Sequence, residues 1–205
     1  MSLKYSLTVT ILSTIVGSLL SIYTTKKISI PMKIKSLKVM TSIFKYRKNS
    51  LTLFFSYDYH FFWDEMLAIC TRNAKDLSCG SESLNSKLFQ SLIEFLHEAR
   101  YYTTQDQAED MVVNAMNLLS DLRSSSNMFG LQMLVLCLPT GYNNYDAWVP
   151  VWLEKLASIT HNDGWDACWL TLLCRARKYS TDPFKWTQAA LPQLLSKAAE
   201  LLDPL

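Results

Sequence analysis

The sequence predicts an all-α protein, and three observations support this fold class. Apolar residues recur at helical spacing through most of the chain, most regularly from Leu84 to Leu201. No segment keeps the alternation with period two that a half-buried strand requires. Only five glycines and six prolines occur in 205 residues, which is few for the tight turns of an all-β domain. With 49% hydrophobic and 19% charged residues, the composition is that of a folded globular chain.

Charge is distributed unevenly, although the net charge is only +2. Residues 1–57 contain nine Lys and Arg and no acid, whereas residues 58–205 contain eleven Lys and Arg against eighteen acids. The basic segment 26–48 forms either a solvated helix face or a surface that attracts an anionic partner, such as nucleic acid, an inositol phosphate or an acidic protein surface. The five cysteines are odd in number and form no C-x-x-C pair, which is typical of a reduced, intracellular protein.

The first helix is expected over residues 4–24, and it allows two interpretations. Its apolar content is that of a membrane span or a targeting segment. Small polar residues nevertheless follow helical spacing along one side of it: Ser6, Thr10, Ser13, Gly17, Ser21 and Thr24. Such a stripe favours a packed helix with one wet edge, and no small-residue cleavage site follows. We therefore predict a core helix, with a membrane or targeting segment as the alternative.

The next helices are delimited by proline and by polar turns. Pro31 opens a helix that extends to about Lys48. The aromatic run Phe54–Trp63 fits either a loop that enters the core or the start of another helix. Leucines at helical spacing then mark a helix over Leu84–Tyr101.

Thr104 and Gln107 have the spacing of a capping box, in which each side chain bonds the backbone N–H of the other residue. They begin the most regular helical pattern in the chain. Ser124–Asn127 is expected to break that helix. Another helix is predicted over Met128–Leu138, and Pro139 stops it.

Two helices led by tryptophan follow, over residues 148–159 and 165–179. Asp146 and Asp163 are the expected N-caps, and Pro150 is expected in the first turn, where its missing N–H costs little. Trp165 and Trp169 share a face with apolar residues, so we expect both to be buried. A last helix begins at residue 183 and is kinked or restarted at residue 192.

Helix pairs are therefore expected to begin near residues 4, 58, 105, 146 and 183. Repeats of about 40–47 residues made of two antiparallel helices are typical of HEAT and armadillo proteins. We predict that residues 1–205 form a single HEAT- or armadillo-like array of nine or ten helices in antiparallel pairs, as a piece of a much longer solenoid.

No motif in the chain predicts catalysis. His60, His97 and His161 lie in different segments without a further ligand at metal spacing, and Cys168 and Cys174 are expected to be core thiols. Five acids are expected on solvated helix faces: Glu94, Glu98, Glu109, Asp110 and Asp121. No nucleophile elbow, phosphate-binding loop or dinucleotide motif occurs. We therefore predict no catalytic, cofactor-binding or metal-binding residue, no cofactor and no enzymatic activity.

One stretch has a more specific pattern. Leu138–Thr140 is followed by a Trp-led helix, and then Trp165, Arg175 and Trp186 form a W-x9-R-x10-W pattern with Pro192 after it. In this order and spacing the chain resembles the proteasome activator complex subunit 4 family, a large HEAT-repeat proteasome activator. The resemblance covers residues 30–200 and is strongest over 136–192.

The resemblance implies a solenoid that caps the proteasome core particle, opens or narrows its gate and favours ubiquitin-independent degradation, including that of acetylated histones. It also implies a nuclear and cytoplasmic location and a role in DNA repair, with neither nucleic acid nor a membrane as a direct partner. Three features depart from the family: the turn 141–145 is shorter, the customary aromatic at the end of the second Trp-led helix is not evident, and residues 202–205 lack the penultimate tyrosine of its docking tail. No functional residue is therefore carried over. Two other functions stay open, namely a membrane-anchored adaptor that uses residues 4–24 and a generic armadillo-type protein-binding module.

Overall fold

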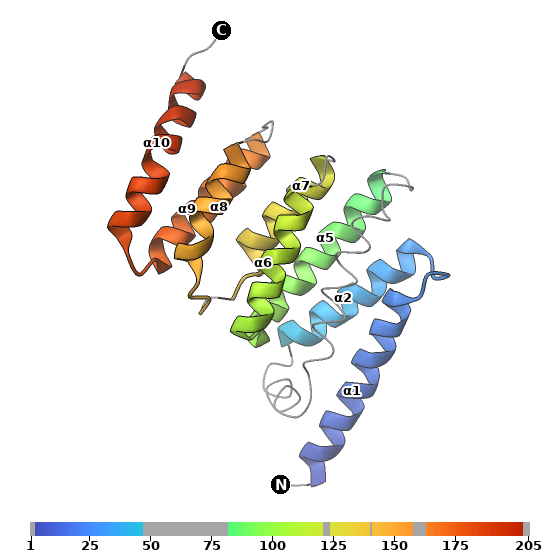
Figure 1. Cartoon of the computed structure of the whole chain (residues 1–205). Helices are drawn as coiled ribbons and strands as arrows, with labels where there is room; N and C mark the ends of the chain where they lie inside the picture. Colours follow the sequence, from blue (N-terminus) through green and yellow to red (C-terminus); the bar gives the residue numbers. More distant parts are fainter. Residues whose placement is uncertain (1–2, 47–81, 121–123, 140, 158–162, 203–205) are drawn as a thin grey trace.

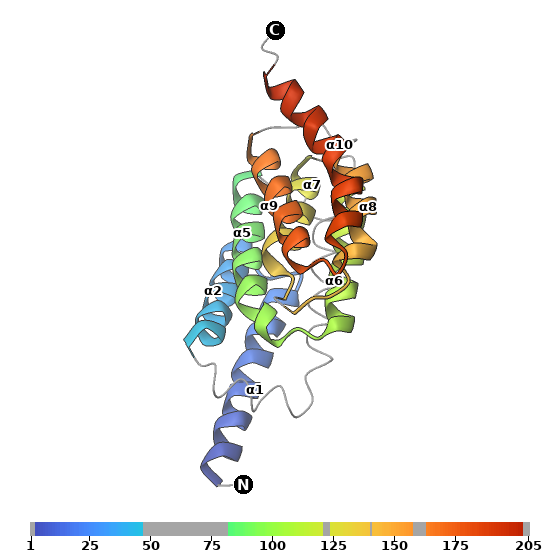
Figure 2. The ribbon, with the colours of Figure 1, turned by 90° about the vertical axis from the view of Figure 1, so that its left-hand side faces the viewer.

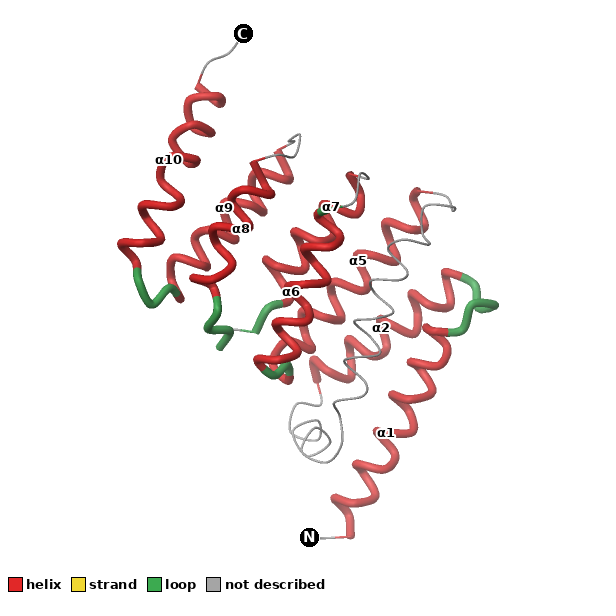
Figure 3. The backbone as a smooth tube through the Cα atoms, viewed as in Figure 1, coloured by secondary structure: helices red, strands yellow, loops and turns green. Residues whose placement is uncertain are grey.

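A computed structural model describes residues 3–46, 82–120, 124–139, 141–157 and 163–202. Within these ranges the chain forms eight α-helices and no strand (Figures 1 and 3). The α-helices are α1 (Leu3–Thr24), α2 (Ile30–Tyr46), α5 (Glu82–Ala99), α6 (Gln105–Leu119), α7 (Ser124–Gln132), α8 (Tyr145–Ala157), α9 (Asp163–Tyr179) and α10 (Pro183–Leu202). A 3₁₀ helix, η2 (Arg100–Tyr102), follows α5, and a π-helix, η3 (Met133–Cys137), continues α7. The all-α prediction is confirmed for this part of the chain, whereas the aromatic run at 54–63 lies outside it.

The helices lie side by side in a row, with α1 at one end and α10 at the other (Figure 1). Along one side of the row, α2 packs against α5, α5 against η3, and α7 and η3 against α9. On the other side, α6 packs against α7 and η3, and α8 packs against α9 and α10. Seen from the side, α5 and α9 lie to the left of α6 and α8 (Figure 2). Neighbours along the row are thus joined by direct helix–helix contact.

Helix α1 packs against α2 through part of its surface. Leu12 and Val16 are buried, and the Ser36 hydroxyl of α2 donates to the Leu19 carbonyl at 2.5 Å. The face of α1 away from α2 exposes Ile11 and Ile15 beside small polar residues. Of the helices within the described ranges, none combines the length and the apolar character needed to cross a membrane.

Three sequence-based expectations about helix boundaries are wrong. The cluster Ser124–Asn127 forms the first turn of α7 and not a break, because Ser and Asn are also the residues that favour helix N-termini. Pro150 is the sixth residue of α8 and lies beyond its first turn, so it denies the carbonyl of Asp146 an intrahelical hydrogen bond. Pro192 lies inside α10, which runs from Pro183 to Leu202 as one helix, so the expected restart at this residue is wrong.

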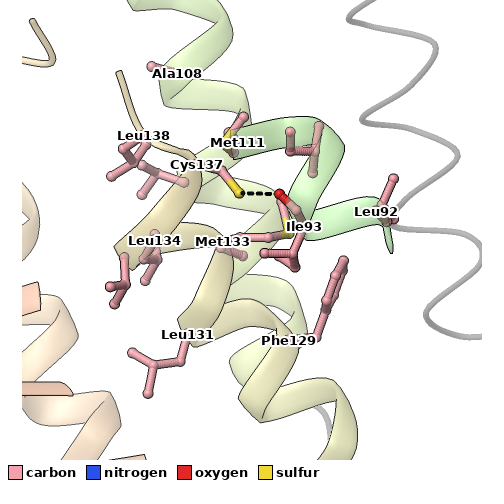
Figure 4. Packing of buried hydrophobic residues seen from close by; sticks show 14 of the residues in the cluster. Leu92, Ile93, Ala108, Met111, Phe129, Leu131, Met133, Leu134, Cys137 and Leu138 are labelled. Atoms are coloured by element: carbon pink, nitrogen blue, oxygen red, sulfur yellow. Dashed lines mark hydrogen bonds between the residues drawn. The ribbon is translucent and has the colours of Figure 1, made fainter. Parts of the chain in front are cut away.

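The centre of the core lies where α5, α6, α7 and η3 meet (Figure 4). Met111 of α6, Phe129 of α7 and Leu134 of η3 are all buried there. Gly130 allows α6 and α7 to approach closely, since a Cβ at this position would lie 2.7 Å from the Ala115 carbonyl oxygen. This close contact fixes the position of η3, whose end forms part of the site described next.

Candidate functional site

The arginine of the W-x9-R-x10-W pattern lies at the junction of α9 with the end of η3. Arg175 donates from Nη1 to the Val135 carbonyl at 2.6 Å and from Nη2 to the Leu138 carbonyl at 2.8 Å. The last carbonyls of a helix lack intrahelical partners, and here both belong to buried residues. Arg175 therefore caps η3 from a different helix, with a fork of donors that suits two adjacent oxygens.

Helix α5 supplies the other partners at this end of η3. His97 Nδ1 lies 2.9 Å from the Leu136 carbonyl oxygen, to which the protonated nitrogen donates. The Cys137 thiol donates to the Ile93 carbonyl at 3.8 Å, as the dashed line in Figure 4 shows. Burial raises the pKa of Cys137 to about 12, against smaller opposing effects of nearby arginines. This thiol is a neutral core donor and not a nucleophile.

Glu109 joins α6 to the start of α8. Its Oε1 accepts hydrogen bonds from Tyr142 Oη at 3.0 Å and from Asn144 Nδ2, and its Oε2 accepts one from Trp148 Nε1 at 2.8 Å. Burial, followed by the hydrogen bond and charge of Glu109, raises the pKa of Tyr142 above its ordinary value. The expectation that Glu109 lies on a solvated face is wrong, because the turn before α8 folds over it.

The same turn is fastened to α6 a second time. Gln105 Nε2 donates to the Gly141 carbonyl at 2.6 Å, and Gln105 Oε1 accepts from the Asn143 backbone N–H at 3.4 Å. The turn before α8 is thus held along its whole described course by α6.

Asp146 connects the start of α8 to the loop before α10. It is the second residue of α8 and not the N-cap, and its Oδ2 accepts from the backbone N–H of Thr181 at 2.8 Å and from the Thr181 hydroxyl at 2.6 Å. Burial alone would raise the pKa of Asp146, but hydrogen bonds from residues 180–182 outweigh it and hold the pKa below 3.8. The ionised carboxylate is therefore the form that this contact favours.

Aromatic side chains fill the space between α8, α9 and α10. Tyr145 makes an edge contact with Trp152 at 6.0 Å between ring centroids and stacks on Tyr179 at 5.9 Å. Trp169 is buried, as predicted, whereas the side chain of Trp165 lies outside the described residues. Four buried polar atoms lack an acceptor within the described part of the chain: Tyr145 Oη and the Nε1 atoms of Trp152, Trp169 and Trp186.

The remaining candidate residues are dispersed. Cys168 is half-buried, but Cys174 is exposed, so the prediction of a core thiol is wrong for Cys174, which lies on the solvent side of α9. His60 and His161 lie outside the described residues. Where side chains are described, no three His, Cys, Asp or Glu residues come close enough to hold a metal ion.

One property is common to Arg175, Glu109 and Asp146. Each side chain is hydrogen-bonded to groups of another segment, and each therefore helps to set how the neighbouring helices lie. Arg175 was singled out in the sequence only as part of the pattern with Trp165 and Trp186, and helical periodicity gave no sign of the roles of Glu109 and Asp146. No protein-family model, curated protein or solved structure matches this chain.

Proposed function

We propose that this chain is the N-terminal part of a non-enzymatic proteasome activator built from HEAT- or armadillo-like repeats. In this role it binds the proteasome core particle and promotes ubiquitin-independent degradation, including that of histones during DNA repair, in the nucleus and cytoplasm. The observation that carries the proposal is the W-x9-R-x10-W pattern at Trp165, Arg175 and Trp186. Its arginine bonds two carbonyls at the end of η3, which lies before α8 in the chain, and so links α9 to a helix that is not its sequence neighbour.

Helix packing supports the repeat architecture. In a solenoid each repeat contacts its neighbours, and here α2, α5, η3 and α9 contact one another in turn. At the end of the row, α10 exposes Phe184, Leu191 and Leu195, which are 72%, 46% and 61% accessible. In the proposed architecture a further repeat covers this apolar face.

The test is affinity purification of the native protein from its own cells through a tag at its N-terminus. The proposal expects core-particle subunits and their peptidase activity in the eluate, at near-stoichiometric yield by mass spectrometry. A generic armadillo-type module gives an eluate without core particle, and that result would reject the proposal. Carbonate extraction of the same cells checks the membrane-anchored alternative, because an anchored chain stays in the pellet.

A second experiment concerns residues 1–205 alone. The resembled family opens the gate with a C-terminal tail, whereas the resemblance places residues 1–205 in the N-terminal part of such a protein. We expect the purified chain to leave peptide hydrolysis by purified core particles unchanged. A several-fold stimulation at micromolar concentration would mean that the described helices act on the gate directly, in conflict with the tail mechanism that the resemblance implies.

A further inference from the structure

Helix α2 presents two adjacent stripes to solvent. One stripe consists of exposed lysines: Lys35, Lys38 and Lys45. The other consists of apolar side chains spaced seven residues apart, which are 48%, 47% and 72% accessible: Met32, Val39 and Tyr46. On a helix of 3.6 residues per turn, these positions form neighbouring strips along its length.

The stripes lie away from the surfaces through which α2 packs on the other described helices. The opposite face of α2 buries Leu37, Met40 and Phe44 completely, and it is this face that packs into the core with α1 and α5. Phe44, for example, meets Phe95 of α5 edge-on at 5.1 Å. Three exposed apolar side chains on one helix line, beside lysines, thus form a surface of α2 that is open to a partner among the described residues.

The charge contributed by α1, α2 and the turn between them is uniformly positive. Helices α1 and α2 and the turn between them contain no acid, and the turn adds Lys26 and Lys27. The ammonium of Lys45 lies 5.4 Å from the centre of the Tyr46 ring, which brings the two stripes together at their C-terminal end. An approaching anionic group meets no repulsion from α1 or α2 here.

We propose that this face of α2 binds an acidic amphipathic helix of a partner protein. Apolar residues of the partner pack on Met32, Val39 and Tyr46, whose seven-residue spacing suits a helix lying alongside. Glutamates or aspartates on one edge of the partner pair with the lysine stripe, which sets its orientation. This inference is independent of the proposed function.

The arrangement fits a protein helix better than an anionic membrane. A helix that lies in a membrane surface has a continuous apolar face between polar flanks. Here the apolar stripe has one side chain every two turns, and the exposed lysines of α2 lie on one side of it only. A one-sided pattern of this kind matches a partner with its own one-sided acidic edge.

The test uses a labelled three-heptad peptide with Leu at positions a and d, Glu at e and g, and Gln elsewhere, so that an acidic edge meets the lysine stripe in either orientation of the peptide. Repulsion between its glutamates disfavours self-association, so it reports on the protein surface. Binding to the full 205-residue chain is followed by fluorescence anisotropy. We expect the combined substitutions Lys35→Gln, Lys38→Gln and Lys45→Gln to weaken binding about tenfold or more and to reduce its salt dependence. Val39→Ser is expected to weaken it about fivefold with the salt dependence retained.

A matched control removes three positive charges from other exposed positions: Lys87→Gln, Arg177→Gln and Lys178→Gln. It should change the affinity by less than about twofold, and circular dichroism confirms that every variant remains helical. The proposal is overturned if the unaltered protein does not bind the peptide measurably. It is also overturned if the control variant weakens peptide binding as much as the lysine variant does, or if a peptide with Lys in place of Glu binds with equal affinity. Sedimentation with phosphatidylserine vesicles in the absence of peptide binding would identify a membrane surface instead.

Discussion

Replacing Arg175 by methionine tests whether the junction between η3 and α9 holds the described helices together. Methionine keeps much of the aliphatic stem but removes both hydrogen bonds, at 2.6 and 2.8 Å, to the Val135 and Leu138 carbonyls. A hydrogen bond from a charged donor contributes about 1.5–3 kcal/mol. Arg175 itself is only half-buried, and water can replace part of the loss. We therefore expect Arg175→Met to lower the free energy of unfolding by about 2–4 kcal/mol.

The assay is urea denaturation followed by far-ultraviolet circular dichroism, with the midpoint and slope fitted together. Arg177→Met is the matched control, because Arg177 is exposed on the same helix and should change stability by less than about 0.5 kcal/mol. Arg175→Lys keeps the charge but cannot reach both carbonyls with a planar fork, so it should fall between Arg175→Met and the unaltered chain. If Arg175→Met behaves like the control, the capping role is refuted.

Three further predictions concern contacts of the described helices. Gly130→Ala places a Cβ 2.7 Å from a carbonyl oxygen and should lower the free energy of unfolding by about 1–3 kcal/mol. Gly17→Ala lies in open space on α1 and should raise the free energy of unfolding by up to about 1 kcal/mol. Equal effects of the two variants in urea denaturation would contradict the close approach of α6 and α7. Because the pKa of Asp146 is held below 3.8, its contribution is complete above that value and is lost as pH falls through the lowered pKa. Asp146→Asn should therefore flatten the fall of stability on the acid side of about pH 4, and an unchanged profile would argue against the Thr181 contact. Glu109→Gln leaves one acceptor for three donors and should cost about 1–3 kcal/mol by thermal unfolding. The exposed control Glu94→Gln should stay within about 0.5 kcal/mol of the unaltered chain, and parity between these two variants would refute the role of Glu109.

Features that depend on a few neighbouring residues were predictable from the sequence. The capping box is an example, since Thr104 accepts from the backbone N–H of Gln107 at 3.3 Å and Gln107 accepts from that of Thr104 at 3.2 Å. The spacing of apolar residues likewise predicted helices over residues 4–24, 84–101 and 165–179, which are close to the observed bounds of α1, α5 and α9. Local propensity and apolar spacing decide these features.

Features that depend on distant segments were not predictable. The carbonyls bonded by Arg175 lie 37 and 40 residues away in the chain, and the donors to Glu109 lie 33 to 39 residues away. Helical periodicity places Glu109 on an outer face but cannot show that the turn before α8 folds over it. The polar cluster at 124–127 was misread for a different reason, because the same residue types occur in linkers and in the first turns of helices.

The repeat architecture and its partner are tested most directly by electron microscopy of core particles purified with the tagged native protein. The proposed function predicts a long helical arch on the outer ring of the core particle. Helices α1 to α10 should fit one segment of that arch as consecutive layers, with further helices packed on Phe184, Leu191 and Leu195 of α10. Core particles with bare outer rings, or a map in which α10 faces solvent at the end of an isolated helical unit, would contradict it.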